Sequence, residues 1–399
     1  MKIVKNILLI FLAGIAGFLV IACLIYPSEY VFRILRWGNA DVYDYKKFPN
    51  RPLSASSTPF HFAEDSQEEQ VRTLFESTSN IDDFDAFLAD KGTQAFIVIQ
   101  NDTILYEEYF NGAQRDSIVT SFSIAKSFTS ALIGIAIDEG YISSVNEPIV
   151  KYLPELSHRD PRFNKITIRH LLMMSSGIKY VEFPFLNGDD AKTYYYPNLR
   201  QLALEQTDLI AEPGQTWLYN NYHPLLLGLI IERATGKTVT AYLQEKIWEP
   251  IGMEFDGSWS MDSEASGFEK MESGINAHAI DFAKFGRLYL NIGNWEGNQI
   301  IPSEWVVEST LPLTNIDNTS FFPTNHIFAS GNGYYTYMWW GMRRGENNYA
   351  FYALGNYGQF IYISPSQKLI VVRNGERYGI EAAQWIDMFY KFADAETPR

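Results

Sequence analysis

The tetrapeptide Ser123-Ile-Ala-Lys126 places a nucleophile and a base one helical turn apart. It opens a nearly apolar run, 123–139, that stops before Gly140, and this pattern predicts a buried helix with a glycine end. At the start of a helix, residues i and i+3 share a face about 5–6 Å apart, and free N–H groups can hold an oxyanion. Desolvation can keep the lysine neutral, so that it activates the serine. The spacing alone is equally consistent with an N-cap serine and a lysine that reaches the surface.

The same spacing recurs at Ser176-Gly-Ile-Lys179. There the glycine follows a predicted helix, 168–175, so the serine is not presented at a helix start. We therefore favour Ser123 over Ser176 as the nucleophile.

A second candidate segment is Tyr219-Asn-Asn221, in a loop that contains proline and glycine. A tyrosine near the serine can relay its proton, and the Asn221 amide can hydrogen-bond both the lysine and a substrate. The spacing Tyr-x-Asn also occurs at Tyr109, Tyr196 and Tyr289, so it is not specific by itself. The position of Tyr219 in a loop before an apolar helix favours it, and a structural tyrosine is the alternative.

The third candidate segment is Gly355-Asn356-Tyr357-Gly358-Gln359, which leads into a predicted strand. Its two glycines let the backbone come close to a ligand. The backbone N–H groups of Gln359 and Ser123 can then complete an oxyanion hole. The alternative is a simple glycine turn between two strands.

The elements around these segments predict a mixed α/β fold. Strands lie near both ends of the chain and helices between them, which indicates a body built by both termini with an inserted helical lobe, about 145–330. We expect an apolar N-terminal helix over 1–26, a juxtamembrane linker and lead-in over 27–80, and the folded domain over 81–399. The main elements expected are strands 95–100, 103–109, 350–354, 359–364 and 369–374, and helices 123–139, 168–175, 225–234, 278–290 and 381–393.

The N-terminal run Ile7–Tyr26 carries no charge and follows Lys2 and Lys5. A helix of about 20 residues rises about 30 Å, enough to cross the hydrocarbon core of a bilayer. The run exceeds the apolar region of a typical cleaved signal peptide, so we expect an uncleaved transmembrane signal anchor. A lipobox ending at Cys23 and a buried core helix are the alternatives. Basic residues flank both ends of the run, so they do not decide its orientation.

Composition excludes several classes of protein. The 399 residues include 32 Lys+Arg and 47 Asp+Glu, a formal charge of −15, which argues against a nucleic-acid partner. A single cysteine excludes an internal disulfide or a cysteine-rich metal site. The six histidines are scattered, without an HExxH pattern, so we expect neither a metal nor a cofactor.

Taken together and in this order, the segments resemble the serine β-lactamase and penicillin-binding protein superfamily, in its class C and esterase-like branch. The resemblance covers about residues 85–390. It implies an antiparallel sheet flanked by helices, with an all-helical lobe that holds the Tyr219 loop across a cleft from Ser123. The segments that carry it are Ser123–Lys126, Thr167–Gly177, Glu212–Asn221, Leu226–Gly236, Trp248–Met253, Asp281–Gly286 and Tyr337–Gly341.

The resemblance also implies a covalent acyl-enzyme. Ser123 would attack a carbonyl while Lys126, with Tyr219, takes its proton; Tyr219 would protonate the leaving group, and water would release the acyl group. Asn221 would orient Lys126 and the substrate. The third motif of the family usually begins with Lys or His, where this chain has Asn356-Tyr357-Gly358. A cation there commonly meets the carboxylate of a β-lactam or a D-alanyl peptide, so its absence favours the family's esterases and 6-aminohexanoate-dimer hydrolases.

Three functions are therefore open. The first is a membrane-anchored serine hydrolase of a small-molecule ester, amide or peptide, with its catalytic domain on the outer (periplasmic or extracellular) side and no protein partner implied. The second is a β-lactamase or D,D-peptidase. The third is a non-catalytic ligand-binding or sensor protein of the same fold. We expect the first, because the Ser123, Lys126 and Tyr219 set is complete.

Overall fold

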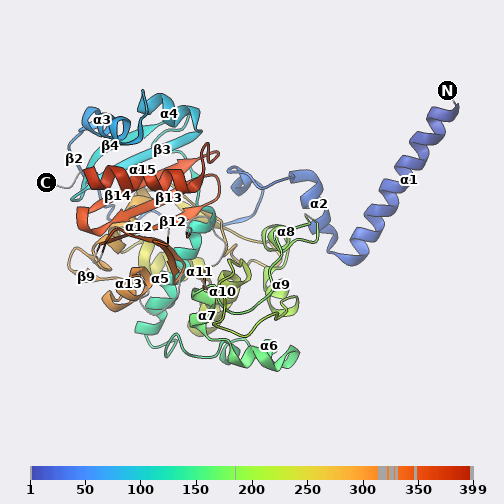
Figure 1. Ribbon diagram of the computed structural model, residues 1–399. Coiled ribbons are helices and arrows are strands. Elements are labelled where there is room, and N and C mark those ends of the chain that lie inside the picture. Colours follow the sequence, from blue (N-terminus) through green and yellow to red (C-terminus); the bar gives the residue numbers. More distant parts are fainter. Residues whose placement is uncertain are drawn as a thin grey trace.

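The computed structural model of the protein describes residues 2–184, 186–312, 321–322, 328, 331–345 and 348–395. Its centre is an eight-stranded sheet in which strands from both ends of the chain lie side by side, so the predicted α/β body is confirmed (Figure 1). Neighbouring strands pair antiparallel, except that β2 runs parallel to β4. In sheet order the strands are β10 (Gly333–Thr336), β11 (Trp339–Arg343), β12 (Tyr349–Gly355), β13 (Gln359–Ser364), β14 (Leu369–Gly375), β3 (Thr93–Gln100), β4 (Thr103–Tyr109) and β2 (Ala63–Glu64).

The predicted strands 95–100 and 103–109 form the hairpin of β3 and β4, which turns at Asn101 and Asp102. Both have positive φ, 51° and 61°, which Asn and Asp tolerate better than most residues and which suits the twist of a two-residue hairpin. Strand β3 is buried along nearly its whole length, because both faces of the central sheet are covered.

Helices cover the two faces of this sheet. On one face, Phe360 and Tyr362 of β13 contact Phe389 of α15 (Ala382–Ala395). On the other face, the alternate residue Ile361 contacts α12 (Ala279–Leu290), where a Cβ on Gly286 would come within 2.9 Å of the Ile361 side chain. Small Gly286 therefore lets α12 lie close against the sheet. The helices α3 (Glu68–Ser79) and α4 (Phe84–Asp90) pack beside α15, where the Phe75 ring of α3 stacks on Phe84 of α4 and on Phe392 of α15.

The central helix α5 (Ala125–Asp138) is buried from Ala125 to Ala136. It packs behind α12, where the rings of Phe128 and Phe285 stack with centroids 3.6 Å apart. This burial agrees with the nearly apolar pattern of its sequence and fixes the first turn of the helix in the middle of the molecule.

A helical lobe lies beside α5. It comprises α6 (Pro154–Arg159), α7 (Ile168–Leu172), α8 (Asp189–Tyr195), α9 (Leu199–Glu205), α10 (Tyr222–Thr235) and α11 (Val239–Leu243). The expected insert 145–330 is not uniformly helical, because it also supplies short strands and the sheet-covering α12. The short strands are β6 (Gly257–Ser260) and β7 (Ile275–Ala277), which join β1 (Asn50–Leu53) and β5 (Val119–Thr120) in a four-stranded sheet, and the pair β8 (Asn294–Trp295) and β9 (Asn298–Gln299). The helix α13 (Ser303–Thr310) follows, and the expected end of the insert near residue 330 lies outside the described residues.

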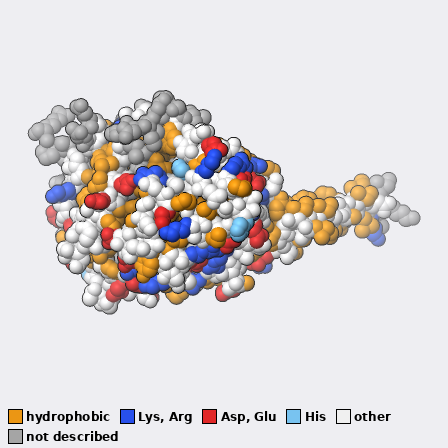
Figure 2. Space-filling model, turned by 90° about the horizontal axis from the view of Figure 1, so that it is seen from below, with side chains coloured by type: hydrophobic (Ala, Val, Ile, Leu, Met, Phe, Trp, Pro, Cys, Tyr) orange, Lys and Arg blue, Asp and Glu red, His pale blue; other side chains and the backbone are white. Residues whose placement is uncertain are grey.

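The N-terminal region begins with α1 (Lys2–Ile25), whose hydrophobic side chains are largely exposed (Figure 2). The segment Val4–Ile25 is, among the described residues, the one helix long and apolar enough to cross a membrane, a property that N-terminal signal sequences share. The segment 27–80, expected as a linker and lead-in, forms α2 (Ser28–Trp37), β1, β2 and α3. The helix α2 packs on α8, with Tyr30, Val31 and Ile34 buried.

Candidate active site

Ser123 lies in a tight turn at the start of the central helix. The turn is η2 (Phe122–Ile124), which leads directly into α5. Two hydrogen bonds fix the preceding residue to β7: Ser121 N donates to Ile275 O at 2.7 Å, and Ile275 N donates to Ser121 Oγ at 3.1 Å. Phe122 then takes a φ of +42°, a strained value for a bulky residue, and this sharp change of direction presents Ser123 to the cleft.

Lys126 is the immediate partner of Ser123. Its Nζ donates to Ser123 Oγ at 2.8 Å and to the backbone carbonyl of Glu272 at 3.0 Å. The side chain is 1% exposed, and burial lowers the pKa of Lys126 to about 7, against the opposing charges of Glu272 and Asp190. Near neutral pH a large fraction of Lys126 is therefore a neutral amine, which can accept the proton of Ser123.

Tyr219 contacts both Ser123 and Lys126. Lys126 Nζ is 4.9 Å from the centre of its ring, and the ring stacks on Trp340 with centroids 5.7 Å apart. Burial raises the pKa of the Tyr219 phenol above its ordinary value, while a hydrogen bond with Ser123 opposes that rise. The phenol is therefore protonated at neutral pH. The two environments separate the roles: Lys126 is suited to act as the base and Tyr219 as the acid.

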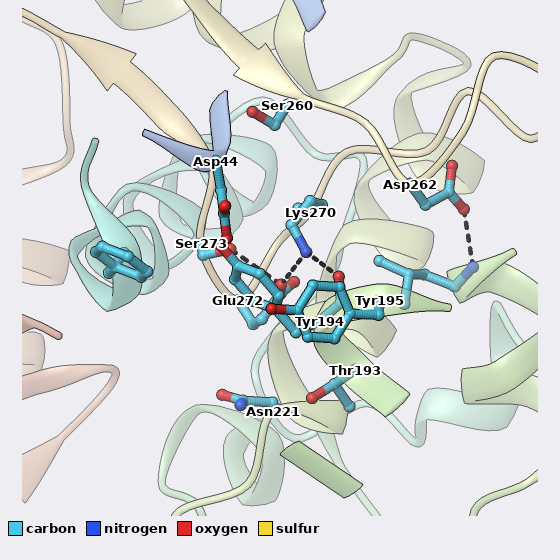
Figure 3. Close-up of polar contacts among 12 residues, drawn as sticks. Asp44, Thr193, Tyr194, Tyr195, Asn221, Ser260, Asp262, Lys270, Glu272 and Ser273 are labelled. Atoms are coloured by element: carbon cyan, nitrogen blue, oxygen red, sulfur yellow. Dashed lines mark hydrogen bonds and ion pairs between the residues drawn. The ribbon is translucent and has the colours of Figure 1, made fainter. Parts of the chain in front are cut away.

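Glu272, whose carbonyl accepts from Lys126, forms a buried ion pair with Lys270 (Figure 3). Lys270 Nζ lies 3.0 Å from Glu272 Oε1 and donates to the backbone carbonyl of Tyr194 at 2.5 Å. Both charged side chains are nearly inaccessible, and Glu272 Oε2 has no partner among the described residues. Because the Glu272 carboxylate acts on Lys126, the cation of Lys270 limits how far that carboxylate favours the ammonium form.

Asn221 is turned toward the helical lobe. Its Nδ2 donates to Tyr180 Oη at 2.8 Å, and Tyr180 Oη donates to Asp190. Its Oδ1 is buried and has no partner within the described chain. The expected contact from Asn221 to Lys126 is thus not among the hydrogen bonds of Lys126. The neighbouring Asn220 is fully buried and braces the loop by donating to Ile178 O at 3.0 Å.

The third segment forms the turn between β12 and β13. Gly355 approaches the nucleophile turn closely, because a Cβ there would lie 2.3 Å from the carbonyl oxygen of Ser121. Asn356 is exposed at the cleft. Tyr357 has a φ of +63°, its ring packs on Phe122 at 5.3 Å, and its hydroxyl donates to Ala40 O.

Gly358 and Gln359 are held from behind by buried side chains. Arg373 Nη1 donates to Gly358 O at 2.7 Å, and a Cβ on Gly358 would collide with that nitrogen at 2.1 Å. The Gln359 side chain is buried and donates to Gly375 O at 2.7 Å, while its Oε1 accepts from Asn374 Nδ2 at 3.0 Å. These contacts fix the backbone of the turn beside Ser123, as an oxyanion hole requires.

A cavity of about 450 Å³ opens in front of Ser123. Aromatic and aliphatic side chains form most of its wall, Glu182 and Glu381 add negative charge, and none of its lining residues is Lys, Arg or His. The residues that line it are Ser123, Glu182, Tyr219, Trp340, Leu354, Gly355, Asn356, Tyr378, Ile380, Glu381 and Ala382. Lys126 is not a lining residue, but it contacts two residues that are, Ser123 and Tyr219.

Several residues of this site give little signal in the sequence. Glu272, Lys270 and Arg373 belong to no motif and lie far from Ser123 along the chain. Trp340 lies in the segment Tyr337–Gly341 and lines the cavity. The Tyr194 carbonyl accepts from Lys270, and the Tyr194 hydroxyl donates to Asp44. Within the described residues, no three His, Cys, Asp or Glu side chains gather as a metal site.

Comparisons with known proteins show the family of this chain. The family model described as Beta-lactamase matches residues 83–377. The chain therefore belongs to the β-lactamase family of serine hydrolases and penicillin-binding proteins.

Three relatives illustrate its place in that family. The 6-aminohexanoate-dimer hydrolase of Paenarthrobacter ureafaciens is 26% identical over 332 residues, 76% of this chain and 78% of its own. A solved structure from Bacillus anthracis, provisionally assigned as a 6-aminohexanoate-dimer hydrolase, superposes with a TM-score of 0.74 at 25% identity and covers 90% of this chain and 94% of its own. Esterase EstB of Burkholderia gladioli is 27% identical over 189 residues, 42% of this chain and 47% of its own.

Proposed function

We propose that the protein is a membrane-anchored serine hydrolase that cleaves an ester or amide bond through an acyl-enzyme on Ser123. The observation that carries this proposal is the 2.8 Å contact between Ser123 Oγ and the buried Lys126 Nζ. Burial lowers the pKa of Lys126 to about 7, so the amine can act as a base near neutral pH. Tyr219, beside both groups, supplies an acid.

The reaction then has two stages. Neutral Lys126 takes the proton of Ser123 as Oγ attacks the carbonyl carbon, and the N–H groups of Ser123 and Gln359 receive the oxyanion. The bond to the leaving group breaks as Tyr219 gives that group a proton, and the Lys126 proton restores the phenol. Water attacks the acyl-enzyme, gives a proton to Lys126, and the released Ser123 oxygen recovers it.

The cleft supports an ester or amide substrate over a β-lactam or a D-alanyl peptide. Its lining residues include Glu182 and Glu381 and no cation, so a substrate carboxylate would find no partner there. The two 6-aminohexanoate-dimer hydrolases and the esterase among the relatives act, by their names, on amides and esters. The aromatic wall around Trp340 and Tyr378 suits an apolar acyl or leaving group.

The proposed location at the membrane is supported by α1. Its exposed apolar length over Val4–Ile25 supports an uncleaved anchor. We place the catalytic domain on the outer side of the cytoplasmic membrane because of the proposed hydrolase chemistry, since the flanking basic residues do not decide the orientation. An anchor of this kind holds the enzyme where extracellular or periplasmic esters and amides are available.

The test is turnover by the full-length protein in detergent. We expect hydrolysis of short-chain p-nitrophenyl esters or anilides, little hydrolysis of nitrocefin, and loss of turnover in Ser123→Ala. Ser176→Ala is the matched control, because it removes a serine from the same spacing outside the cleft, and it should keep activity. Turnover retained in Ser123→Ala would reject the proposed nucleophile. Rapid nitrocefin hydrolysis would instead establish the β-lactamase alternative, and binding without turnover would establish the non-catalytic one.

A further inference from the structure

The helix α2 has an exposed face that its packing leaves uncovered. Val31 and Ile34 are buried against the body, whereas Phe32 is 60% exposed and Leu35 is 56% exposed. Arg36 is exposed beside them and makes no ion pair with any residue that the structure describes. Residues 32, 35 and 36 are spaced i, i+3 and i+4, so they share one side of the helix. This side combines two large apolar groups with one cation.

The helix is held so that this face points outward. Tyr30 Oη donates to the carbonyl of Leu186 at 2.9 Å, and Arg33 Nη1 donates to the carbonyl of Tyr195 at 3.1 Å. The Arg33 guanidinium also lies 5.4 Å from the centre of the Phe48 ring. These contacts come from the buried side of α2, so rotation that would bury Phe32 and Leu35 requires breaking all of them.

The face lies directly beside the proposed membrane anchor. Only Tyr26 and Pro27 separate the last residue of α1 from the first residue of α2. Ile25 and Ser28 are three residue steps apart, a span of at most about 11 Å, so α2 begins close to the level where α1 would leave the bilayer. Figure 1 shows α2 between α1 and the body of the molecule. Tyr26 and Trp37 stand at its two ends, and aromatic residues of this kind prefer the membrane–water interface.

The charge around α2 also fits a bilayer surface. The segment 27–50 has four basic and three acidic residues, a net charge of +1, in a chain whose net charge is −15. A hollow of about 480 Å³ beside the helix is lined by apolar Phe32 and Trp37 together with Arg33, Arg36 and Lys47, as well as Glu29 and Glu264. An apolar and cationic mixture is what the boundary between lipid headgroups and acyl chains accommodates.

We propose that the outer face of α2 is an interfacial membrane contact, with Phe32 and Leu35 at the headgroup–acyl boundary of a phospholipid bilayer and Arg36 among its phosphates. The proposal rests on the membrane anchoring by α1 proposed above. Since α2 is bound to Leu186 and Tyr195 of the helical lobe, the contact holds the catalytic domain in one orientation on the membrane surface. The catalytic domain is then fixed in orientation relative to the membrane and is not connected to α1 by a flexible linker.

The test uses the full-length chain in phospholipid vesicles with one fluorescent label at a time. Cys23, the one cysteine of the sequence, is first replaced in a Cys23→Ala background. An environment-sensitive dye is then attached through Phe32→Cys, Leu35→Cys, Ile15→Cys or Thr73→Cys, and nitroxide-labelled lipids serve as quenchers. Ile15 reports on the anchor, and Thr73 on α3 is the control, because it is exposed on the far side of the body.

We expect the labels at 32 and 35 to shift to shorter emission wavelength and to lose most of their fluorescence to nitroxides near the headgroups. The label at 15 should be quenched by nitroxides deep in the acyl chains, and the label at 73 by neither. If 15 is quenched but 32 and 35 behave like 73, the α2 contact is overturned while the anchor stands. If 15 is not quenched either, the anchor and the contact both fail, while turnover by Ser123 is judged separately. Two labelled positions on α2 keep the test valid if one replacement prevents folding.

Discussion

The chain contains the spacing Ser-x-x-Lys twice, and the structure uses the two copies differently. At Ser123 the spacing falls on the first turn of a buried helix, and Lys126 Nζ meets Ser123 Oγ at 2.8 Å. At Ser176 the serine contacts a histidine in place of the lysine. Ser176 Oγ lies 2.6 Å from Nε2 of the buried His223, and Lys179 is exposed. Ser176 itself is fully buried and does not reach the cleft.

The glycine between Ser176 and Lys179 explains the difference. Gly177 has a φ of +78°, and a Cβ there would lie 2.2 Å from the carbonyl of Ala211. This turn leads the chain away from helical geometry, so residue i+3 no longer faces residue i. The same spacing therefore brings a serine into contact with a buried lysine beside the cleft only where the chain keeps helical geometry. Burial affects both copies: it lowers the pKa of Lys126 to about 7 in the first copy and the pKa of His223, the partner of Ser176, to about 3.

The largest effect should come from removing the nucleophile. Ser123→Ala should lower kcat/KM for an ester substrate by about 10⁴-fold or more, since no acyl-enzyme can form. Ser176→Ala should leave kcat/KM within a few fold and change only stability. Steady-state kinetics of both variants decides this. Equal losses in the two variants would contradict the distinction between the copies.

Removing the base should have the next largest effect. Lys126→Met should lower kcat/KM by about 10³-fold, because Ser123 loses its proton acceptor, whereas Lys179→Met should be near neutral. In the wild type, activity should rise with pH through about 7, the pKa to which burial lowers Lys126, because the ammonium form cannot accept a proton. A flat profile between pH 5 and 9 would contradict the role of Lys126.

Lys126→Met, which should lower activity, should make the folded protein more stable. The unfolded chain holds the Lys126 proton up to a pKa of about 10.5, and the folded chain releases it at about 7. The unfolded state therefore binds more protons between these values, and burial of Lys126 disfavours folding most at pH 7 and below. Lys126→Met should raise the free energy of unfolding at pH 7, with a smaller gain at pH 10. Denaturant unfolding at the two pH values measures this, and a gain that grows with pH would contradict it.

Removing the acid should cost less than removing the base. Tyr219→Phe should lower kcat about 10²-fold for an amide, whose leaving group needs a proton, and less for a p-nitrophenyl ester, whose leaving group does not. The ring contact with Trp340 remains, so circular dichroism and thermal unfolding should be nearly unchanged. Equal losses on both substrates would indicate a role other than leaving-group protonation.

A smaller and more specific effect should come from the ion pair of Glu272 and Lys270. The Glu272 carboxylate raises the pKa of Lys126, so Glu272→Gln should move the acid limb of the kcat/KM profile to lower pH. Lys270→Met leaves the carboxylate without its cation, and the limb should move to higher pH. Opposite shifts in two correctly folded variants support the coupling. An unshifted limb in both variants, or shifts in the same direction, would contradict this coupling.

The smallest effect on activity, with a clear effect on stability, should come from the second copy. Burial lowers the pKa of His223 to about 3 from its usual 6.5. Between these values the unfolded chain binds more protons, so the free energy of unfolding falls as pH drops through this range, by as much as about 5 kcal/mol. His223→Gln cannot titrate, and its stability should depend less on acid. Denaturant midpoints at pH 7 and pH 4.5, compared with wild type, measure the difference; identical pH dependence would contradict it.

The sequence predicts the local parts of this molecule well. The β3–β4 hairpin, the buried α5 and the late strands are each set by turn residues and apolar periodicity, and the structure confirms the α/β fold they imply. The order of motifs also identifies the family that the comparisons find. The roles of the individual site residues stay predictions until the variants are measured.

The parts that the sequence does not predict depend on long-range contacts. Glu272 lies 146 positions from Lys126, and its carbonyl reaches Lys126 because β7 pairs with β5, which leads into the Ser123 turn. Arg373 comes under the Gly358 turn through the pairing of β13 with β14. The segment 27–80, expected as a juxtamembrane linker and lead-in, docks through Tyr30 and Arg33 on residues 156 and 162 positions away along the chain. No local pattern encodes such partners, because tertiary packing selects them.

The central claim is that Ser123, and not Ser176, forms the covalent intermediate. The most direct measurement is the intact mass of the full-length protein in detergent after reaction with a fluorophosphonate, followed by peptide mapping of the adduct. The account predicts one phosphonyl group on the wild type and on Ser176→Ala, mapped to the peptide containing Ser123, and none on Ser123→Ala. An adduct that persists in Ser123→Ala, or none on folded wild-type protein, would contradict it.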